Sequence, residues 1–282
     1  MTLYTGKELL EAARSGGYAV GAFNCHTLDM ITAVVDVATA ERAPVILQFT
    51  EGSIKSNGWE YVSAVARQAA ISAPVPVAIH LDHGASFNLA VRAIRHGFTS
   101  VMIDGSELSY AENVTLTRRV VEMAHAAGVS VEAEIGHVGG VEDGQGSMHG
   151  WMTEPADAEQ FWQDAGMDYL ATAFGTAHGF YKEVPKLDLD RVSLIARRVA
   201  IPLVMHGGSG VPDEQVLAAI ARGICKFNVA TELKDAWARA LREFLANNPD
   251  EMDPRRVMGP ARNAVQTVVR DKIRLCGSSG RA

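Results

Sequence analysis

The sequence predicts an α/β protein whose parallel strands close into a (β/α)8 TIM barrel with extra C-terminal helices. Short apolar runs alternate with helical patterns along the chain, and eight such units fit within its 282 residues. This alternation predicts a parallel sheet. An open doubly wound sheet is the alternative. Polar residues suited to catalysis follow many different strands, which favours the barrel, because such residues collect at one face of it.

The eight predicted strands are short, apolar and often β-branched, which is typical of strands buried on both faces of a sheet. They lie at residues 19–23, 45–49, 77–81, 100–103, 129–134, 169–173, 203–205 and 225–228. Helical patterns between them include 29–41, 112–127 and 192–199, and a longer helical tail runs from 232 to about 275. No Pro-rich or Gly-rich linker divides the chain, so we expect a single domain over residues 1–282.

Composition and charge exclude several classes of protein. Hydrophobic residues make up 48% of the chain and charged residues 21%, which disfavours disorder and fibrous structure. The net charge of -7 argues against a nucleic-acid partner, since proteins that bind the phosphate backbone are usually basic. No apolar run reaches membrane-spanning length, and the N-terminus shows no apolar signal core. Three scattered cysteines suit a reducing compartment, so we expect a cytoplasmic protein with no membrane partner.

Three histidines end short motifs that each follow a predicted strand. The motifs are Leu81-Asp82-His83, Gly175-Thr176-Ala177-His178-Gly179 and His206-Gly207-Gly208-Ser209-Gly210. Zinc held by three imidazoles, with a fourth position left open, is a catalytic site rather than a structural one. Asp82 adds a carboxylate beside the first histidine. The sequence therefore predicts a zinc enzyme whose ligands come from the ends of different strands.

Two stretches near the C-terminus predict an anion site beside this metal. Gly207-Gly208-Ser209-Gly210 lies between a strand and a helix that we expect to begin near Pro212. Glycines there let backbone N–H groups converge on an anion at the helix N-terminus. Asn228-Val229-Ala230-Thr231 offers amide, hydroxyl and backbone donors after the eighth strand. Barrel enzymes often hold phosphate with the loops after strands seven and eight. A tight turn with a helix N-cap is the alternative interpretation.

Seven motifs, in order along nearly the whole chain, resemble the class II, zinc-dependent ketose-bisphosphate aldolases, which include fructose-1,6-bisphosphate and tagatose-1,6-bisphosphate aldolases. They are Leu81-Asp82-His83, Ser100-Val101-Met102-Ile103-Asp104, Glu132-Ala133-Glu134, Gly139-Gly140-Val141-Glu142-Asp143, Gly175-Thr176-Ala177-His178-Gly179, His206-Gly207-Gly208-Ser209-Gly210 and Asn228-Val229-Ala230-Thr231-Glu232. The resemblance implies a reversible aldol cleavage of a ketose 1,6-bisphosphate to dihydroxyacetone phosphate and glyceraldehyde 3-phosphate.

The resemblance also implies a role for each catalytic position. His83, His178 and His206 match the zinc ligands, and zinc serves as a Lewis acid that polarises the C2 carbonyl and stabilises the enediolate. Asp82 matches the general acid–base that carries the proton of the C4 hydroxyl. Glu142 matches a glutamate on a glycine-rich loop that carries the proton of the dihydroxyacetone carbon and closes over substrate.

Further positions match a second metal position and the phosphate site. Asp104 and Glu134 correspond to a second zinc position, and their alternative role is to orient the histidines. Gly179, Lys182 and the loop Gly207-Gly208-Ser209 would bind the phosphate of dihydroxyacetone phosphate. Part of that site resembles the family's monovalent-cation site.

Two positions concern the far half of the substrate. Thr50, after the second strand, matches a position that contacts it. Asn24, after the first strand, lies at the same mouth and could bond a sugar hydroxyl. The C4 epimer stays open, since Asn228-Val229-Ala230-Thr231-Glu232-Leu233-Lys234 resembles tagatose-type members, whereas the ending Gly277-Ser278-Ser279-Gly280 resembles short fructose-type members.

The sequence leaves three other functions open, and its helical tail predicts an oligomer. The chain could be an aldolase for another phosphorylated ketose, such as an inositol-catabolic intermediate. It could instead be a lyase that forms a Schiff base at Lys226, or a non-catalytic partner subunit of an aldolase. In the helical tail, Trp237, Leu241, Phe244 and Leu245 recur at near-helical spacing. We expect this apolar face to mediate a homodimer or homotetramer.

Overall fold

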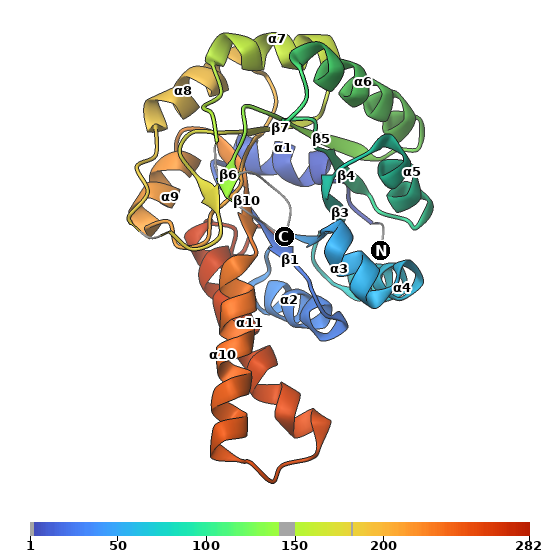
Figure 1. The fold of residues 1–282 in the computed structure, drawn as a ribbon, viewed down its shortest axis with the longest axis vertical. Helices are drawn as coiled ribbons and strands as arrows, with labels where there is room; N and C mark the ends of the chain where they lie inside the picture. The colour runs from blue at the N-terminus through green and yellow to red at the C-terminus, as the bar shows by residue number, and fades with distance from the viewer. Residues whose placement is uncertain (1–2, 141–149, 182) are drawn as a thin grey trace.

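Eight parallel strands form a closed barrel in the computed structural model, which describes residues 3–140, 150–181 and 183–282 (Figure 1). Around the barrel the order is β1-β2-β3-β4-β5-β7-β9-β10, and β10 pairs with β1 to close it. The strands are β1 (Val20–Asn24), β2 (Val45–Phe49), β3 (Val77–Gly84), β4 (Ser100–Ile103), β5 (Ser130–Ile135), β7 (Tyr169–Thr172), β9 (Leu203–Met205) and β10 (Ile224–Val229). Each predicted strand overlaps one of these, and the predicted TIM barrel is confirmed.

Helices surround the barrel in the order that the alternating pattern predicts. They are α1 (Gly6–Gly16), α2 (Leu28–Glu41), α3 (Glu51–Asn57), α4 (Trp59–Ser72), α5 (Phe87–Arg95), α6 (Tyr110–Ala126), α7 (Pro155–Ala165), α8 (Leu189–Arg198), α9 (Asp213–Ile220), α10 (Thr231–Asn247) and α11 (Pro254–Leu275). Local signals set several boundaries. Ser109 caps α6 in a reciprocal capping box with Glu112, and the glycine at position 166 ends α7 in the left-handed region.

The inside of the barrel changes from apolar to polar along its axis. At the N-terminal end, Leu10 of α1 packs with Val20 and Ile46 in one buried apolar cluster, so α1 covers that end. Two residues beyond the paired Ala22 and Ile46 of β1 and β2, and so next on the same face, the paired residues are Asn24 and Gln48. The interior therefore becomes polar toward the C-terminal ends of the strands, where the predicted site residues lie.

A short two-stranded pair lies above this polar end and was not predicted. It joins β6 (Gly139–Gly140) to β8 (Ala177–His178). Gly140 has a φ of 97°, and a Cβ there would lie 2.4 Å from the carbonyl oxygen of His178, so only glycine fits this close approach. Two glycines give no strand signal in a sequence, yet this pairing holds the backbone of His178 at the mouth.

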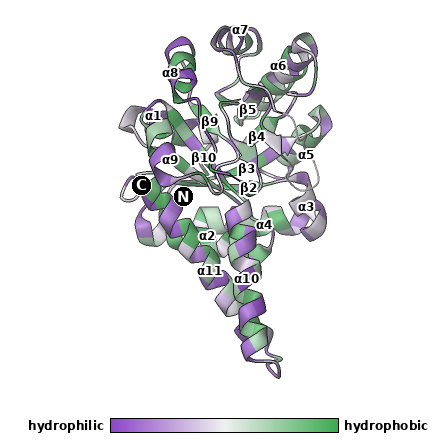
Figure 2. Ribbon diagram, turned by 60° about the vertical axis from the view of Figure 1, so that its left-hand side comes forward, coloured by the Kyte–Doolittle hydropathy of each residue, from purple (hydrophilic) through white to green (hydrophobic). Residues whose placement is uncertain are grey.

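The helical tail consists of two helices that form a projecting hairpin. Helices α10 and α11 pack against each other, and the far end of the hairpin extends away from the barrel (Figures 1 and 2). Its base is fixed by α11, which packs on α2 and joins it through ion pairs from Arg274 to Glu41 and from Arg262 to Asp36. Among the residues that the structure describes, none of the helices has the length and apolarity of a membrane span.

Candidate active site

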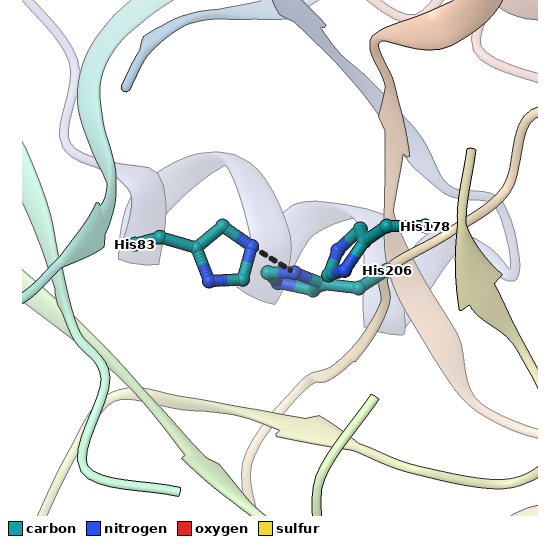
Figure 3. Close-up of side chains that lie close together, drawn as sticks. All are labelled: His83, His178 and His206. Carbon is teal, nitrogen blue, oxygen red and sulfur yellow. Dashed lines mark hydrogen bonds between the residues drawn. The ribbon is translucent and has the colours of Figure 1, made fainter. Parts of the chain in front are cut away.

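Three histidine rings meet at the C-terminal mouth of the barrel (Figure 3). His83 lies in β3, His178 in β8, and His206 directly after β9. The ring centroids are 4.7 to 5.8 Å apart, and a ring nitrogen of each residue lies within 4.8 Å of the others. The structure thus brings together the three residues that were predicted from separate strand ends.

The backbone of β3 is irregular where it presents Asp82 and His83. Consecutive side chains of a regular strand point to opposite faces, so both residues could not enter the barrel mouth. His83 instead has a left-handed φ of 47°, which is uncommon for a residue with a Cβ. The pairing with β4 also shifts between Leu81 and Gly84. This bulge turns both side chains toward the same site, and such strain is typical of functional positions.

A carboxylate holds each of two histidines from behind. Asp104 accepts a hydrogen bond from Nδ1 of His83 at 2.8 Å, and Glu132 accepts one from Nε2 of His206 at 2.7 Å. An ionised carboxylate can only accept, so these two nitrogens carry the protons. Nε2 of His83 and Nδ1 of His206 then face each other at 3.0 Å, close enough to share a proton in a hydrogen bond or to share a metal ion. A shared cation would stabilise this arrangement, and three imidazoles are a donor set that suits zinc.

The charges of the three rings also fit a cation site. Burial lowers the pKa of His178 and of His206, and the neighbouring His83 lowers both further, so these two rings are held neutral. Burial lowers the pKa of His83 as well, but Asp82 and Asp104 raise it by more and leave it well above its usual value. Asp82 and Asp104 therefore favour one positive charge at His83. A metal ion can supply that charge when it replaces the extra proton of the His83 ring.

His83, Asp104 and Glu134 form a second group of side chains that could hold a metal ion, because one possible ligand atom of each lies within 4.8 Å of the others. Asp104 supports His83. Burial raises the pKa of the Asp104 carboxyl, but the contact with His83 helps to hold that pKa below its ordinary value. Glu134 is buried, and its Oε2 has no hydrogen-bond partner among the described residues. Burial and the nearby Asp104 raise the pKa of Glu134 to about 8. Asp104 thus fits the supporting role, and Glu134 keeps an oxygen available for a cation.

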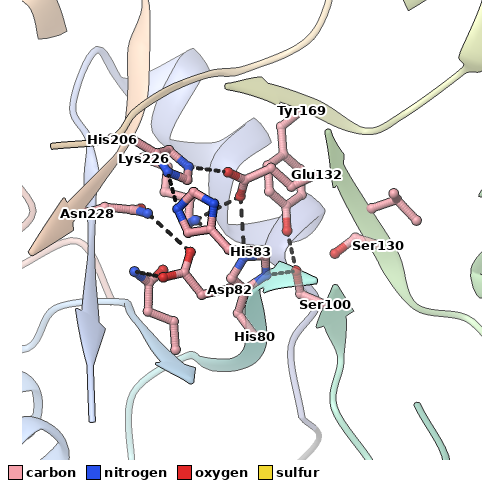
Figure 4. A network of polar contacts seen from close by, with 12 residues as sticks. His80, Asp82, His83, Ser100, Ser130, Glu132, Tyr169, His206, Lys226 and Asn228 are labelled. Carbon is pink, nitrogen blue, oxygen red and sulfur yellow. Dashed lines mark hydrogen bonds and ion pairs between the residues drawn. The ribbon is translucent and has the colours of Figure 1, made fainter. Parts of the chain in front are cut away.

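Asp82 is fully buried, and three amide side chains donate to its carboxylate, among them that of Asn228 (Figure 4). Asn24 donates to Oδ2 at 2.8 Å and Gln48 to the same oxygen at 3.3 Å, while Asn228 donates to Oδ1 at 3.4 Å. Burial raises the pKa of Asp82, but the charge of His83 and the hydrogen bond from Asn24 help to outweigh it and lower the pKa overall. Asp82 is therefore an oriented carboxylate beside the histidines.

Asn24 and Gln48 form part of the support of this carboxylate. The side-chain oxygen of Asn24 accepts from Gln48 at 2.6 Å, while its amide nitrogen donates to Asp82. The observed contacts of Asn24 are thus with protein groups, and its expected contact with a sugar hydroxyl stays a prediction. Sequence reasoning missed Gln48. The signal that could have found Gln48 is strand register, because Gln48 of β2 pairs directly with Asn24 of β1.

A buried ion pair lies beneath the histidines and was also missed (Figure 4). Lys226 of β10 contacts Glu132 of β5 at 2.7 Å, and both side chains are fully buried. Nζ of Lys226 also lies 3.4 Å from His80 Nε2. Glu132 therefore bridges Lys226 and His206 and fixes the direction of that ring. Its spacing of two from Glu134 places both glutamates on the inner face of β5, a signal that the sequence does contain.

Two hollows adjoin the histidines. The first, called the larger cavity below, has a volume of about 280 Å³, and its lining includes His83, His178, Asp104, Glu134 and Thr50. The second, called the glycine-lined hollow, contains most of the predicted phosphate-binding residues. Its lining residues are His178, Gly179, Gly207, Gly208, Ser209, Asn228, Ala230 and Thr231. The side chain of Val229 lies in the apolar core instead, so only its backbone could contact a ligand.

The glycine-lined hollow has a fixed backbone. Tyr181 donates from its hydroxyl to the carbonyl of Gly207 at 2.7 Å and accepts from the N–H of Ala177 at 2.7 Å, which ties two loops together. Gly207 has a φ of 62°, and a Cβ there would lie 2.5 Å from the carbonyl of Ala177. At Gly208 a Cβ would lie 2.3 Å from the ring of Phe227. These glycines are required by close packing, and they leave the hollow open.

Two predicted residues, Glu142 and Lys182, lie outside the described residues. Thr50 is the N-cap of α3, where its side chain accepts from the N–H of Ser53, and it lines the larger cavity as expected for a contact with the far half of a substrate. The predicted site residues that the structure describes therefore all belong to the mouth of one barrel.

Comparisons with known proteins agree with this architecture. The family model described as class II fructose-bisphosphate aldolase matches residues 4–281. A fructose-bisphosphate aldolase of Geobacillus stearothermophilus is 45% identical over 288 residues, which cover 100% of this chain and 99% of that protein. The YdjI aldolase from Escherichia coli K12 has a TM-score of 0.89 at 34% identity and covers 100% of both chains.

A putative fructose-1,6-bisphosphate aldolase from Coccidioides immitis is also similar, with a TM-score of 0.91 at 30% identity over 98% of this chain and 97% of its own. The family match and the 45% identical relative each span the barrel and its C-terminal hairpin. The predicted family is therefore confirmed: this chain belongs to the class II fructose-bisphosphate aldolases and is a carbon–carbon lyase.

Proposed function

We propose that this aldolase reversibly cleaves a ketose 1,6-bisphosphate to dihydroxyacetone phosphate and glyceraldehyde 3-phosphate, with a zinc ion held by His83, His178 and His206. The main support is the meeting of these three rings with the oriented carboxylate of Asp82, between the glycine-lined hollow and the larger cavity. The name of the Geobacillus relative makes fructose 1,6-bisphosphate the first substrate to test.

The two hollows suggest how the substrate lies. We assign the phosphate of the dihydroxyacetone half to the glycine-lined hollow, where backbone N–H groups and the side chains of Asn228 and Thr231 can donate. Lys182 and a monovalent cation would add positive charge there. The carbon chain then crosses the histidines, and the aldehyde half enters the larger cavity beside Thr50. This direction places the C4 hydroxyl near Asp82.

The side chains around the reacting carbons divide the chemistry. A bound zinc ion would supply the Lewis acid that draws electron density from the C2 carbonyl. Asp82, ionised and held by three amides, accepts the proton of the C4 hydroxyl as the bond between C3 and C4 breaks. Glu142 then returns a proton to C3 of the dihydroxyacetone half. Asp104 and Glu132 keep the rings of His83 and His206 in one orientation throughout.

The alternatives differ in what the structure offers them. Lys226, the candidate for a Schiff base, is fully buried in an ion pair with Glu132 and lines neither hollow, which argues against it. A non-catalytic partner subunit would have no need for the complete set of histidines and Asp82. Tagatose 1,6-bisphosphate and another phosphorylated ketose remain as second substrates to test, because they differ from the first in the aldehyde half.

We also propose a cytoplasmic homodimer or homotetramer with no nucleic-acid partner. The projecting hairpin of α10 and α11 supports association, because Leu245 and Met252 are exposed along its far part, the latter at 89%. Large exposed apolar side chains on a projecting element favour contact with another copy through an isologous interface.

The first prediction concerns the metal and the reaction together. Wild-type enzyme should cleave fructose or tagatose bisphosphate, lose activity after chelation, and recover it with zinc or cobalt, because the described residues of the site offer no other strong electrophile. A retro-aldol assay with both sugars side by side, with metal content measured on the same sample, checks this. Activity that survives complete metal removal would contradict the zinc mechanism.

The second prediction separates ligands from other histidines. Replacing His83, His178 or His206 by alanine should each remove bound zinc while the barrel stays folded, as followed by metal analysis and circular dichroism. His125→Ala is the matched control, because this histidine lies on α6 and pairs with Asp168 away from the mouth. Full zinc occupancy in His178→Ala would show that another group is the third ligand.

The third prediction concerns the general acid–base. Asp82→Ala should keep zinc and still bind dihydroxyacetone phosphate, yet lose a factor of ~10² or more in turnover, the usual scale for removal of such a group. Steady-state kinetics with metal analysis measures both properties. Turnover close to that of the wild type would transfer the role to another residue, with Glu142 as the next candidate.

The fourth prediction concerns the oligomer. Sedimentation at micromolar concentration should show a species of at least twice the 30.2 kDa chain mass. Replacing Met252 and Leu245 by glutamate should weaken it, since burial of these side chains would then cost charge desolvation. A single species at the chain mass for the wild type would refute the proposal.

A further inference from the structure

His137 is a buried histidine of the larger cavity that the mechanism above does not use. It follows the end of β5, after a turn at Gly136 whose φ is 78°. The residue is only 6% exposed, and it lines the same cavity as His83 and His178. Its Nε2 is buried and has no hydrogen-bond partner among the described residues. A buried polar nitrogen without a partner costs free energy unless a ligand satisfies it.

The ring of His137 is held in a fixed position by three kinds of contact. Its Nδ1 lies 3.0 Å from the hydroxyl of Ser106. The ring of Trp151 stacks on it at a centroid distance of 4.9 Å and an interplanar angle of 27°. Two backbone hydrogen bonds, of 3.0 and 3.1 Å, pair the same two residues. Only Nε2 is left for another partner, so the protein has prepared one donor or acceptor site at the cavity wall.

This position is linked to the histidine cluster through Ser106 and Asp104. The N–H of Ser106 donates to Asp104 at 3.1 Å, and Asp104 holds His83. The distance between the free nitrogen of His137 and the reacting centre is thus set by a short chain of hydrogen bonds. Such fixed spacing suits the recognition of a second group on one substrate.

The rest of the cavity wall indicates which group that is. Beyond the residues already described, the lining contains Glu51, Glu107 and apolar side chains such as Leu108. Among the described lining residues no Lys or Arg occurs, and His137 is the one nitrogen-bearing side chain besides His83 and His178. The nearest carboxylate oxygen, on Glu107, is 4.0 Å from Nε2 and belongs to a largely exposed side chain. This part of the wall therefore suits a hydroxyl of the aldehyde half rather than its phosphate.

We propose that His137 is a specificity-determining residue whose Nε2 hydrogen-bonds a hydroxyl of the aldehyde half of the substrate. The proposal rests on the proposed aldolase function, because that function places the aldehyde half in the larger cavity. The enzyme therefore selects polyhydroxylated aldehydes over aldehydes that lack hydroxyls. Removing the imidazole leaves the substrate hydroxyl without its hydrogen-bond partner in the cavity. The loss of activity therefore falls on the step that uses the aldehyde.

The test compares wild type with His137→Ala in three reactions. In condensation with dihydroxyacetone phosphate, kcat/KM for glyceraldehyde and for glyceraldehyde 3-phosphate should fall about 10- to 100-fold, mainly through KM. With propionaldehyde, which has no hydroxyl, the fall should stay below about threefold. Proton exchange at the carbon of dihydroxyacetone phosphate needs no aldehyde and should also stay within about threefold, with zinc content unchanged.

Two further variants keep the result interpretable. His137→Gln retains a side-chain amide near the same wall and should recover part of the activity lost with glyceraldehyde. The same variant replaces His137→Ala in the test if the alanine variant does not fold. His125→Ala, on the surface of α6, should match the wild type in every arm.

Two outcomes would overturn the proposal for His137. One is an equal loss with propionaldehyde and glyceraldehyde, which indicates a structural role. The other is a loss confined to glyceraldehyde 3-phosphate, which indicates phosphate binding. If the wild type itself shows neither proton exchange nor condensation, the proposed function fails instead, so the two failures are distinct.

Discussion

The mouth of this barrel depends on one close approach, that of His83 Nε2 to His206 Nδ1 at 3.0 Å. At this distance the two nitrogens share either a proton, as in the hydrogen bond drawn in Figure 3, or a metal ion. Asp104 and Glu132 enforce the approach, because each fixes the proton on the far nitrogen of its ring. The left-handed backbone of His83 serves the same end, since a regular strand could not present that ring beside Asp82. A demand for one cation thus explains the bulge and both carboxylates.

That arrangement carries a cost inside the barrel. Glu132 and Lys226 are both fully buried, and a buried ion pair adds little net stability, whereas removal of one partner typically costs about 3–5 kcal/mol. The pair is better explained by orientation, since Glu132 directs His206 with its other oxygen. Stability has other sources, namely the apolar interior covered by α1 and the layer between strands and helices. The interior is therefore divided into a packed end and a polar end that serves the reaction.

The sequence allowed much of this to be predicted, and physical reasons explain the rest. Buried parallel strands are short apolar runs, so all eight were found, and a barrel brings their C-terminal ends together, so the histidines and Asp82 could be assigned to one site. The roles of Gln48, Glu132 and His137 could not be read, because they depend on register across strands and on which side-chain atoms have partners. The hairpin was expected only as helix, since its projection depends on where α11 meets α2.

Four carboxylates close to the histidines differ in function because their oxygens meet different groups. Asp82 receives three amide donors, which help to keep it ionised, as a base requires. Asp104 and Glu132 each accept from an imidazole and therefore orient it. Glu134 keeps one oxygen without a described partner, and burial raises its pKa to about 8. Environments that move the pKa values of Asp82 and Glu134 in opposite directions mark different roles, so Glu134 is suited to a cation or a proton and not to permanent support.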